Sequence, residues 1–230
     1  MPHEHQAAVG RRRSPRDPRP GARTDGGPSR AARPAGEPLL LRAGRDPLRF
    51  PPKWDEVRAS ETLGYRVGYC TTKATLFLAL CKAAGIPARV HTGLISVEIM
   101  RGIFPSFAFR ALPAAGGHAW LEVELDGEWK PMDSYINDRR FYDGALKRLL
   151  ASGRTTGFSL SMTKGPTSCA FSFGEKGFVH MGAVVEDHGI WEDVADYMAS
   201  PAYVRMSRMQ QLVFPWMARM SNRTIEAIRG

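Results

Sequence analysis

The clearest hydrophobic pattern in the chain lies in residues 68–90, GYCTTKATLFLALCKAAGIPARV. Apolar side chains recur there at helical spacing, which predicts a helix with one buried face from about residue 70 to residue 84. Gly85 and Pro87 mark its end, because glycine favours the C-terminal cap and proline cannot continue a helix. The predicted buried stripe consists of Ala74, Phe77, Leu78, Cys81 and Ala84.

The segments after this helix have the patterns of strands. ARVHTGLISV (88–97) is β-branched and alternating and predicts a strand. HAWLEVEL (118–125) and EWKPMD (128–133) flank Asp126–Gly127, and a DG pair between alternating runs indicates a hairpin with a two-residue turn. Residues 98–117 form an unusually long apolar connection and are a candidate wall of a binding cleft.

The remaining patterns complete an α+β chain. We expect helices at 53–62, 141–153 and 191–229, the last interrupted at Pro201 and Pro215, and strands at 157–162, 168–173 and 177–185. The order of helix, strand, hairpin and further strands and helices predicts an α+β fold with an antiparallel sheet. The helix at residues 70–84 is expected to pack on that sheet.

Positive charge is concentrated in the first 50 residues, which contain eleven Arg, no Lys and five acidic residues, or +6 of the formal +9. This Arg/Pro/Gly-rich segment has too few large apolar residues to offset its ordering entropy, so residues 1–48 are expected to form a disordered tail. The domain is expected at 49–230, with a core at 60–140 and a C-terminal β/α extension at 141–230. The tail leaves a phosphate contact open, but a solvated linker is favoured and no nucleic-acid partner is expected.

Several features bear on location. The RRR at residues 11–13 is not followed by the apolar stretch of an export signal, and no run approaches the ~18 apolar residues of a membrane span. LVFPWMARM (212–220), with arginines nearby, is open to a membrane-surface contact, although packing on its own domain is favoured. Three cysteines without a CxxC pair indicate neither a disulfide framework nor structural zinc. A cytoplasmic protein of unknown oligomeric state is expected.

Cys70 stands at the start of the predicted helix, where unpaired N–H groups and the helix dipole stabilise negative charge. Its pKa is therefore expected to lie below the free value of ~8.5. Cys81 on the buried stripe and Cys169 in a predicted strand lack this position and are expected to be ordinary buried cysteines.

A nucleophilic thiol needs a base and an orienting group, and the predicted hairpin supplies such a pair. With a two-residue turn, His118 pairs with Tyr135 and Trp120 pairs with Asp133. His118 and Asp133 then lie diagonally on one face of the sheet, ~7–8 Å apart at the backbone. Cys70, His118 and Asp133 thus form a candidate catalytic triad.

These motifs resemble the transglutaminase-like superfamily: GYC with KATLFLALCKAAGIPARV, then HAWLEVELDGEW, then PMD, across roughly residues 60–140. The resemblance implies a cysteine-proteinase-like core and a papain-like triad of Cys70 as nucleophile, His118 as base and acid, and Asp133 as orienter. It implies acyl chemistry on amide or related bonds of a peptide or protein, through an acyl-enzyme and without a cofactor. Hydrolase, peptidase and acyltransferase activities stay open. The alternative is a non-catalytic member that serves as a peptide-binding or scaffolding module.

Other polar residues have weaker claims. His180, Asp187 and His188 have a spacing that matches no standard metal site, and a turn with a solvated histidine is favoured, so no metal is expected. The backbone N–H of Cys70 is one expected oxyanion donor, and a second is sought among the nearby tyrosines. The substrate-cleft candidates are Tyr69, Tyr65 and Trp120.

Overall fold

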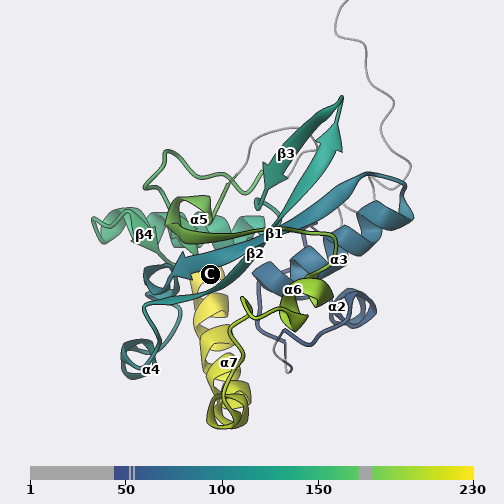
Figure 1. Cartoon of the computed structure of the whole chain (residues 1–230). Helices are drawn as coiled ribbons and strands as arrows, with labels where there is room; N and C mark the ends of the chain where they lie inside the picture. Colours follow the sequence, from purple (N-terminus) through teal and green to yellow (C-terminus); the bar gives the residue numbers. More distant parts are fainter. Residues whose placement is uncertain (1–43, 52, 54, 171–177) are drawn as a thin grey trace, which may run out of the picture. The chain divides into compact units, whose positions relative to one another are not determined.

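A four-stranded antiparallel sheet forms the centre of the fold, in the strand order β3-β2-β1-β6 (Figure 1). Residues 44–51, 53, 55–170 and 178–230 are described in the computed structural model, and all of them belong to one of its two units, Pro34–Gly230. The strands are β1 (Ala88–Ser96), β2 (Ala115–Leu125), β3 (Glu128–Met132) and β6 (Val184–Trp191). The predicted α+β class with an antiparallel sheet is confirmed.

Helix α3 (Cys70–Ala83) forms where the apolar stripe predicts it and packs against β1 and β2 (Figure 1). It begins at Cys70 because the preceding Tyr69 is extended, and the N–H of Tyr69 donates to the hydroxyl of Thr72 in the first turn. It ends before Gly85, whose φ of +68° favours glycine. Four of the five predicted buried side chains lie in the main core: Ala74, Phe77, Leu78 and Cys81. The fifth, Ala84, caps the C-terminal end of the helix and is only partly buried.

The β2–β3 hairpin has the predicted turn. Asp126 and Gly127 have φ of +55° and +77°, the left-handed values that a tight two-residue turn requires. The register runs from Leu125↔Glu128 to Leu121↔Met132 and is the predicted one. β3 ends at Met132, however, so the predicted pairs His118–Tyr135 and Trp120–Asp133 do not form. The chain turns there instead, and the N–H of Ile136 donates to the carbonyl of Asp133.

The buried side chain of Lys73 on α3 hydrogen-bonds the chain segment that follows β3. Lys73 Nζ donates to the carbonyl oxygens of Tyr135 at 3.0 Å, Ile136 at 2.8 Å and Asp46 at 2.5 Å. Burial lowers the pKa of Lys73 to about 8. Leu48 is buried as well, and its N–H donates to a carboxylate further along the chain. The packed region therefore includes residues before 49, while residues 1–43 of the predicted tail lie outside the described part.

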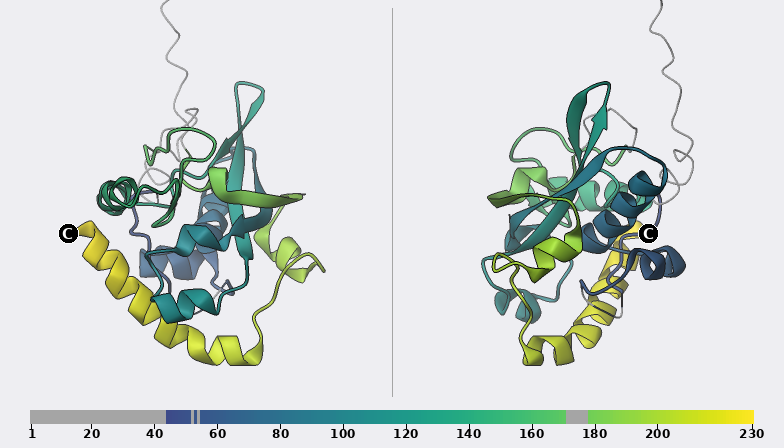
Figure 2. Two further views of the ribbon diagram at one scale, coloured as in Figure 1. Left: turned by 90° about the vertical axis from the view of Figure 1, so that its left-hand side faces the viewer. Right: turned by 45° about the vertical axis from the view of Figure 1, so that its right-hand side comes forward.

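The remaining helices and strands surround the sheet (Figure 2). The helix predicted at 53–62 begins later, because the N–H of Arg58 donates to the Glu61 carboxylate and fixes the first turn there. The helix at 141–153 is confirmed, and the strand at 157–162 is present only as two short paired pieces. These elements are α2 (Ala59–Tyr65), η1 (Val97–Met100), α4 (Ser106–Arg110), α5 (Arg139–Ala151), β4 (Thr156–Gly157), β5 (Leu160–Ser161), η2 (Met181–Ala183), α6 (Val194–Ala199) and α7 (Arg208–Arg229).

The last strand of the sheet starts later than the sequence predicts. A strand was expected at 177–185, but residues 181–183 form η2 and β6 begins only at Val184. The amides of residues 179–181 donate to the Asp133 carboxylate and cannot join a ladder. Of the strand expected at 168–173, residues 168–170 are irregular and residues 171–173 lie outside the described residues.

Pro215 does not interrupt the C-terminal helix, contrary to the prediction. Helix α7 starts with a capping box, in which Ser207 and Gln210 each bind the other's backbone N–H. A proline inside a helix costs ~3 kcal/mol, and burial of large side chains such as Phe214 and Ile225 at ~1.5–3 kcal/mol each offsets it. Among the described residues, no helix is both long and apolar enough to cross a membrane.

Candidate functional site

Cys70 is the first residue of α3, and its sulfur lies at the edge of β2. The N–H of Glu124 on β2 donates to the carbonyl of Pro87, the residue just before β1. Amide directions alternate along a strand, so the N–H of Ala119, five residues earlier, points away from β1. The pairing with β3 stops at Leu121, so the N–H of Ala119 takes no part in the β2–β3 ladder, and it favours the thiolate form of Cys70. The thiol therefore lies near the peptide group that joins His118 to Ala119.

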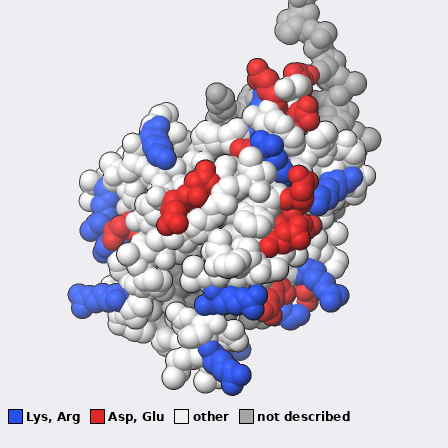
Figure 3. Space-filling view, viewed as in Figure 1, with Lys and Arg blue, Asp and Glu red and all other residues white. Residues whose placement is uncertain are grey.

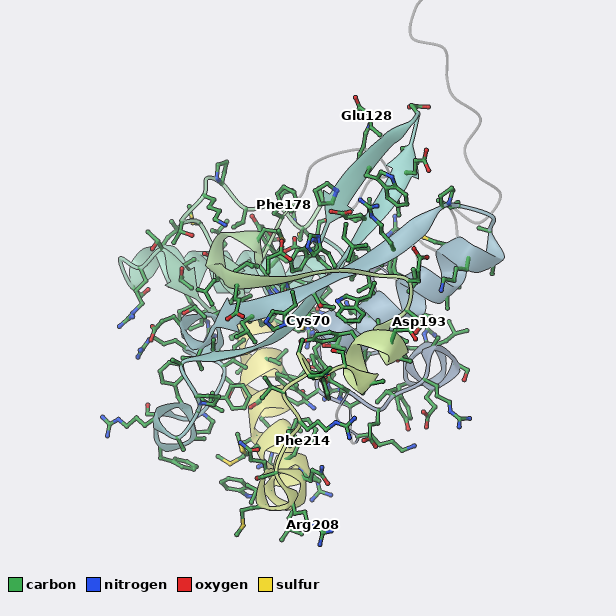
Figure 4. All side chains as sticks on the ribbon, viewed as in Figure 1. Cys70, Glu128, Phe178, Asp193, Arg208 and Phe214 are labelled. Carbon is green, nitrogen blue, oxygen red and sulfur yellow. The ribbon has the colours of Figure 1, made fainter. Side chains whose placement is uncertain are left out.

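The thiol of Cys70 is buried among other side chains (Figure 4). Burial raises its pKa to about 11, and the negative charge of Asp55 adds to the increase. The N–H groups of Ala119 and Thr71 and the Thr71 hydroxyl, 3.8 Å from the sulfur, act in the opposite direction but do not compensate. The expectation of a lowered pKa is therefore wrong for this state of the protein, because desolvation outweighs the helix N-terminus.

His118 lies on β2 opposite Gly93 of β1 and is only 2% exposed. The centroid of its ring is 5.7 Å from that of Trp120 and 5.3 Å from that of His180. Within the described part of the chain, neither ring nitrogen of His118 has a hydrogen-bond partner. Burial, with a smaller contribution from His180, lowers the pKa of His118 well below 6.5, so the imidazole is neutral near pH 7.

Asp133 is fully buried directly after β3. One oxygen accepts from the N–H of Val179 at 2.7 Å, and the other accepts from His180 at 2.8 Å and Met181 at 3.0 Å. Burial nevertheless raises the pKa of this carboxyl to about 7. No hydrogen bond joins Asp133 to His118 in the described residues. The two are linked indirectly, because Asp133 holds the backbone of His180 and the His180 ring lies beside that of His118.

His180 is a neighbour of the site that the sequence prediction missed. A solvated turn histidine was expected, but His180 is 4% exposed. Its Nε2 lies 2.7 Å from the hydroxyl of Ser159, which donates to the amide oxygen of Asn137. Burial lowers the pKa of His180 to about 3. No local pattern indicates a buried histidine at this position, because the packing partners are distant in the chain.

The three cleft candidates occupy different environments. Tyr69 is buried at the start of α3, and its hydroxyl donates to the Asp55 carboxylate. Tyr65 is 41% exposed at the end of α2. Trp120 is buried and stacks on His91, with ring centroids 4.3 Å apart, and its ring centroid is 5.7 Å from that of His118. None of the three lines either of the two cavities described below.

A cavity of about 570 Å³ is lined mainly by α6, the first half of α7 and the segment between them, and a second of about 470 Å³ lies beside η2. The larger is connected to the Cys70 helix by hydrogen bonds, because Tyr203 on its wall donates to Asp55 at 2.8 Å and Asp55 also binds Tyr69. Cys70 and His118 line neither cavity. Across the described ranges, no cluster of three or more His, Cys, Asp or Glu side chains could hold a metal ion.

Two comparisons with known proteins found a match. The profile of the transglutaminase-like superfamily matches residues 42–134, a range that includes Cys70, His118 and Asp133. No curated protein matches the chain significantly. The crystal structure of "a Putative Cysteine Protease" from Cytophaga hutchinsonii is 18% identical with a TM-score of 0.37, over 70% of this chain and 37% of that chain. This chain thus spans little more than a third of that protein's length. The helix that begins with Cys70 and strands β1–β3 thus lie in the part of the chain that matches the transglutaminase-like superfamily.

Proposed function

We propose that this chain carries out thiol-dependent acyl chemistry on amide or related bonds of peptides or proteins. Cys70 is the nucleophile, His118 is the general base and acid, and Asp133 is the orienting residue. The observation that carries the proposal is the Cys70 sulfur at the N-terminus of α3, where the peptide N–H that follows His118 favours its thiolate form. All three residues fall within the part of the chain that matches the superfamily.

Both reacting groups start neutral, because burial raises the pKa of the Cys70 thiol to about 11 and lowers that of His118 well below 6.5. The thiol proton therefore passes to a ring nitrogen of His118 while the sulfur attacks the carbonyl carbon. A carbon–sulfur bond forms, and the carbonyl π electrons move to the oxygen. Collapse of this intermediate breaks the carbon–nitrogen bond, and the leaving amine takes the proton from His118.

The second half of the cycle resolves the thioester on Cys70. Water or an amine attacks the thioester carbon while His118 accepts its proton, and the sulfur leaves and is reprotonated by His118. Water gives hydrolysis, and an amine gives acyl transfer. The backbone N–H of Cys70, in the first turn of α3, is one proposed oxyanion donor, because such groups have no partner within the helix.

Asp133 has its proposed orienting role through the segment that it binds. Its carboxylate fixes the amides of residues 179–181, and this places the ring of His180 5.3 Å from that of His118. A buried acceptor with three donors holds a rigid backbone. Loss of Asp133 would therefore free the backbone of His180, which lies beside the proposed base His118, and would break no direct hydrogen bond to His118.

A non-catalytic binding module is the second candidate function. The observations that favour it are the 6% exposure of Cys70, its raised pKa, and the lack of any hydrogen bond to His118 within the described residues. A thiol in this state reacts slowly unless substrate binding opens the site. The two functions differ in whether a bound peptide is turned over.

The test is incubation of the full chain with a pool of amide-bearing peptides and a small primary amine, followed by mass spectrometry of the peptides. We expect hydrolysed or amine-exchanged peptides with the wild type and with Cys169→Ala, and none with Cys70→Ala. Cys169 is a suitable control because it is a partly exposed cysteine outside the site. Peptides that bind equally to wild type and Cys70→Ala without any change in mass would establish the binding module instead.

A further inference from the structure

Helix α7 carries two apolar stripes, and only one of them is buried. The core-facing stripe includes Phe214, Ala218 and Ile225. The second stripe lies in the first half of the helix, at the i, i+3, i+4, i+7 spacing of a single helix face. Its members are Met209 (71% exposed), Leu212 (79%), Val213 (38%) and Trp216 (49%). The expectation that LVFPWMARM packs on its own domain is thus met on one side of the helix only.

A residue from a distant part of the chain extends the exposed stripe. Phe107 in α4 is 59% exposed, and its ring centroid lies 5.9 Å from that of Trp216. We call these five side chains, on α4 and the first half of α7, the α4–α7 patch. Large apolar side chains gathered on one surface mark a site of interaction more often than singly exposed ones do. Phe107, Leu212 and Trp216 line neither of the two cavities, and their exposed fractions of 59%, 79% and 49% show that these side chains face the outside of the protein.

The charged residues on α4, and on α7 up to residue 225, are all basic. The sequence from residue 197 to residue 225 contains four Arg and no Asp or Glu, and residues 99–121 contain two Arg and no acidic residue. Arg110, Arg208 and Arg219 have exposed side chains, and in the described ranges none of these three forms an ion pair. On the face shown in Figure 3, the surface over α4 and the start of α7 carries basic side chains, whereas acidic side chains gather over the sheet and hairpin. Figure 4 shows Arg208 at the N-terminal end of α7.

We propose that the α4–α7 patch binds the surface of a lipid bilayer that contains anionic lipids. Trp, Phe, Leu and Met beside arginines form the side-chain set of a helix that lies in the membrane interface, where apolar side chains enter the acyl boundary and arginines contact phosphates. The high exposure of Phe107, Leu212 and Trp216 suits a bilayer, because separate apolar side chains that project from a helix can enter its acyl boundary. This binding does not depend on the acyl chemistry proposed above.

The test is sedimentation of the full chain with vesicles of phosphatidylcholine, with or without about one third phosphatidylglycerol. We expect the wild type to bind the phosphatidylglycerol vesicles, with weaker binding to pure phosphatidylcholine and at high salt. The double variant Leu212→Ser/Trp216→Ser should bind about tenfold or more weakly, because two large apolar side chains no longer enter the membrane. This variant keeps every charge, so the Arg-rich N-terminal segment contributes equally to both proteins.

The matched control is Leu150→Ser/Val185→Ser, which removes two side chains of 59% and 62% exposure outside the patch and should bind as the wild type does. Thermal melts of both variants check that the fold is retained. Lack of vesicle binding by the wild type, or equal loss in the patch and control variants, would overturn the proposal. A concentration-dependent dimer that only the patch variant abolishes, without vesicle binding, would also overturn it and identify a second copy as the occupant.

Discussion

Asp133 should make the stability of the domain depend on pH in a direction opposite to that of an ordinary surface carboxylate. Burial raises the pKa of its carboxyl from 3.8 to about 7. Between these values the folded protein holds a proton that the unfolded chain has lost, so the free energy of unfolding falls as the pH rises through this window. The range from about pH 5 to pH 8 includes about two pH units of this window, because the window ends near pH 7. Over these two units the free energy of unfolding should fall by about 3 kcal/mol, at ~1.4 kcal/mol per unit.

Asp133→Asn removes the ionisable group and keeps its size. At about pH 5 the variant should be less stable by roughly 1–3 kcal/mol, because the Asn NH₂ group cannot accept from the amides that one carboxylate oxygen now binds. At about pH 8 the wild type has lost this advantage, and the variant should be as stable or more stable. Urea unfolding of both proteins at the two pH values measures the difference. The buried histidines contribute to both proteins and cancel in the comparison. We expect the wild type to lose about 3 kcal/mol more than the variant over this range; equal losses would refute the reasoning.

Three further results are expected. Iodoacetamide near neutral pH should alkylate the partly exposed Cys169 before Cys70 and Cys81, because burial raises the pKa values of the latter two to about 11 and about 12. If peptide mapping finds Cys70 labelled first, the Cys70 thiol is more open than the structure shows. In an NMR titration, His118 and His180 should stay neutral between about pH 5 and pH 8, since burial lowers both pKa values, and a midpoint near the ordinary ~6.5 would contradict their burial. In thermal melts, Gly144→Ala should lower stability by roughly 1–3 kcal/mol, because the added Cβ would lie 1.9 Å from the carbonyl oxygen of Ile228. The control Gly64→Ala places its Cβ in open space and should be neutral or slightly stabilising.

The parts of the fold that short-range patterns determine could be predicted from the sequence. The stripe of Ala74, Phe77, Leu78 and Cys81 is enough to define α3, and the Asp126–Gly127 turn is enough to define the hairpin register. Both depend on residues within a few positions of one another. The placement of Cys70 at the first position of the helix and of His118 on β2 followed from the same local signals.

The surroundings of the site could not be predicted, because they depend on distant contacts. The Asp133 carboxylate binds amides 46 to 48 residues further along the chain, and no local pattern indicates this. The same contact prevents a strand at residues 179–181 and buries His180. The raised pKa of Cys70 likewise depends on complete burial, which the position at a helix start does not reveal.

The central claim, that Cys70 is an acyl-accepting nucleophile assisted by His118, is tested most directly by mapping the acyl adduct. The full chain is mixed with an activated peptide ester, quenched in acid and digested for mass spectrometry. The account predicts one acyl group on Cys70, removable by hydroxylamine, with unchanged formation in Cys169→Ala and roughly a hundredfold slower formation in His118→Ala, as expected for loss of a general base. Acylation of Cys169 alone, or of Cys70 at the same rate with and without His118, would contradict it.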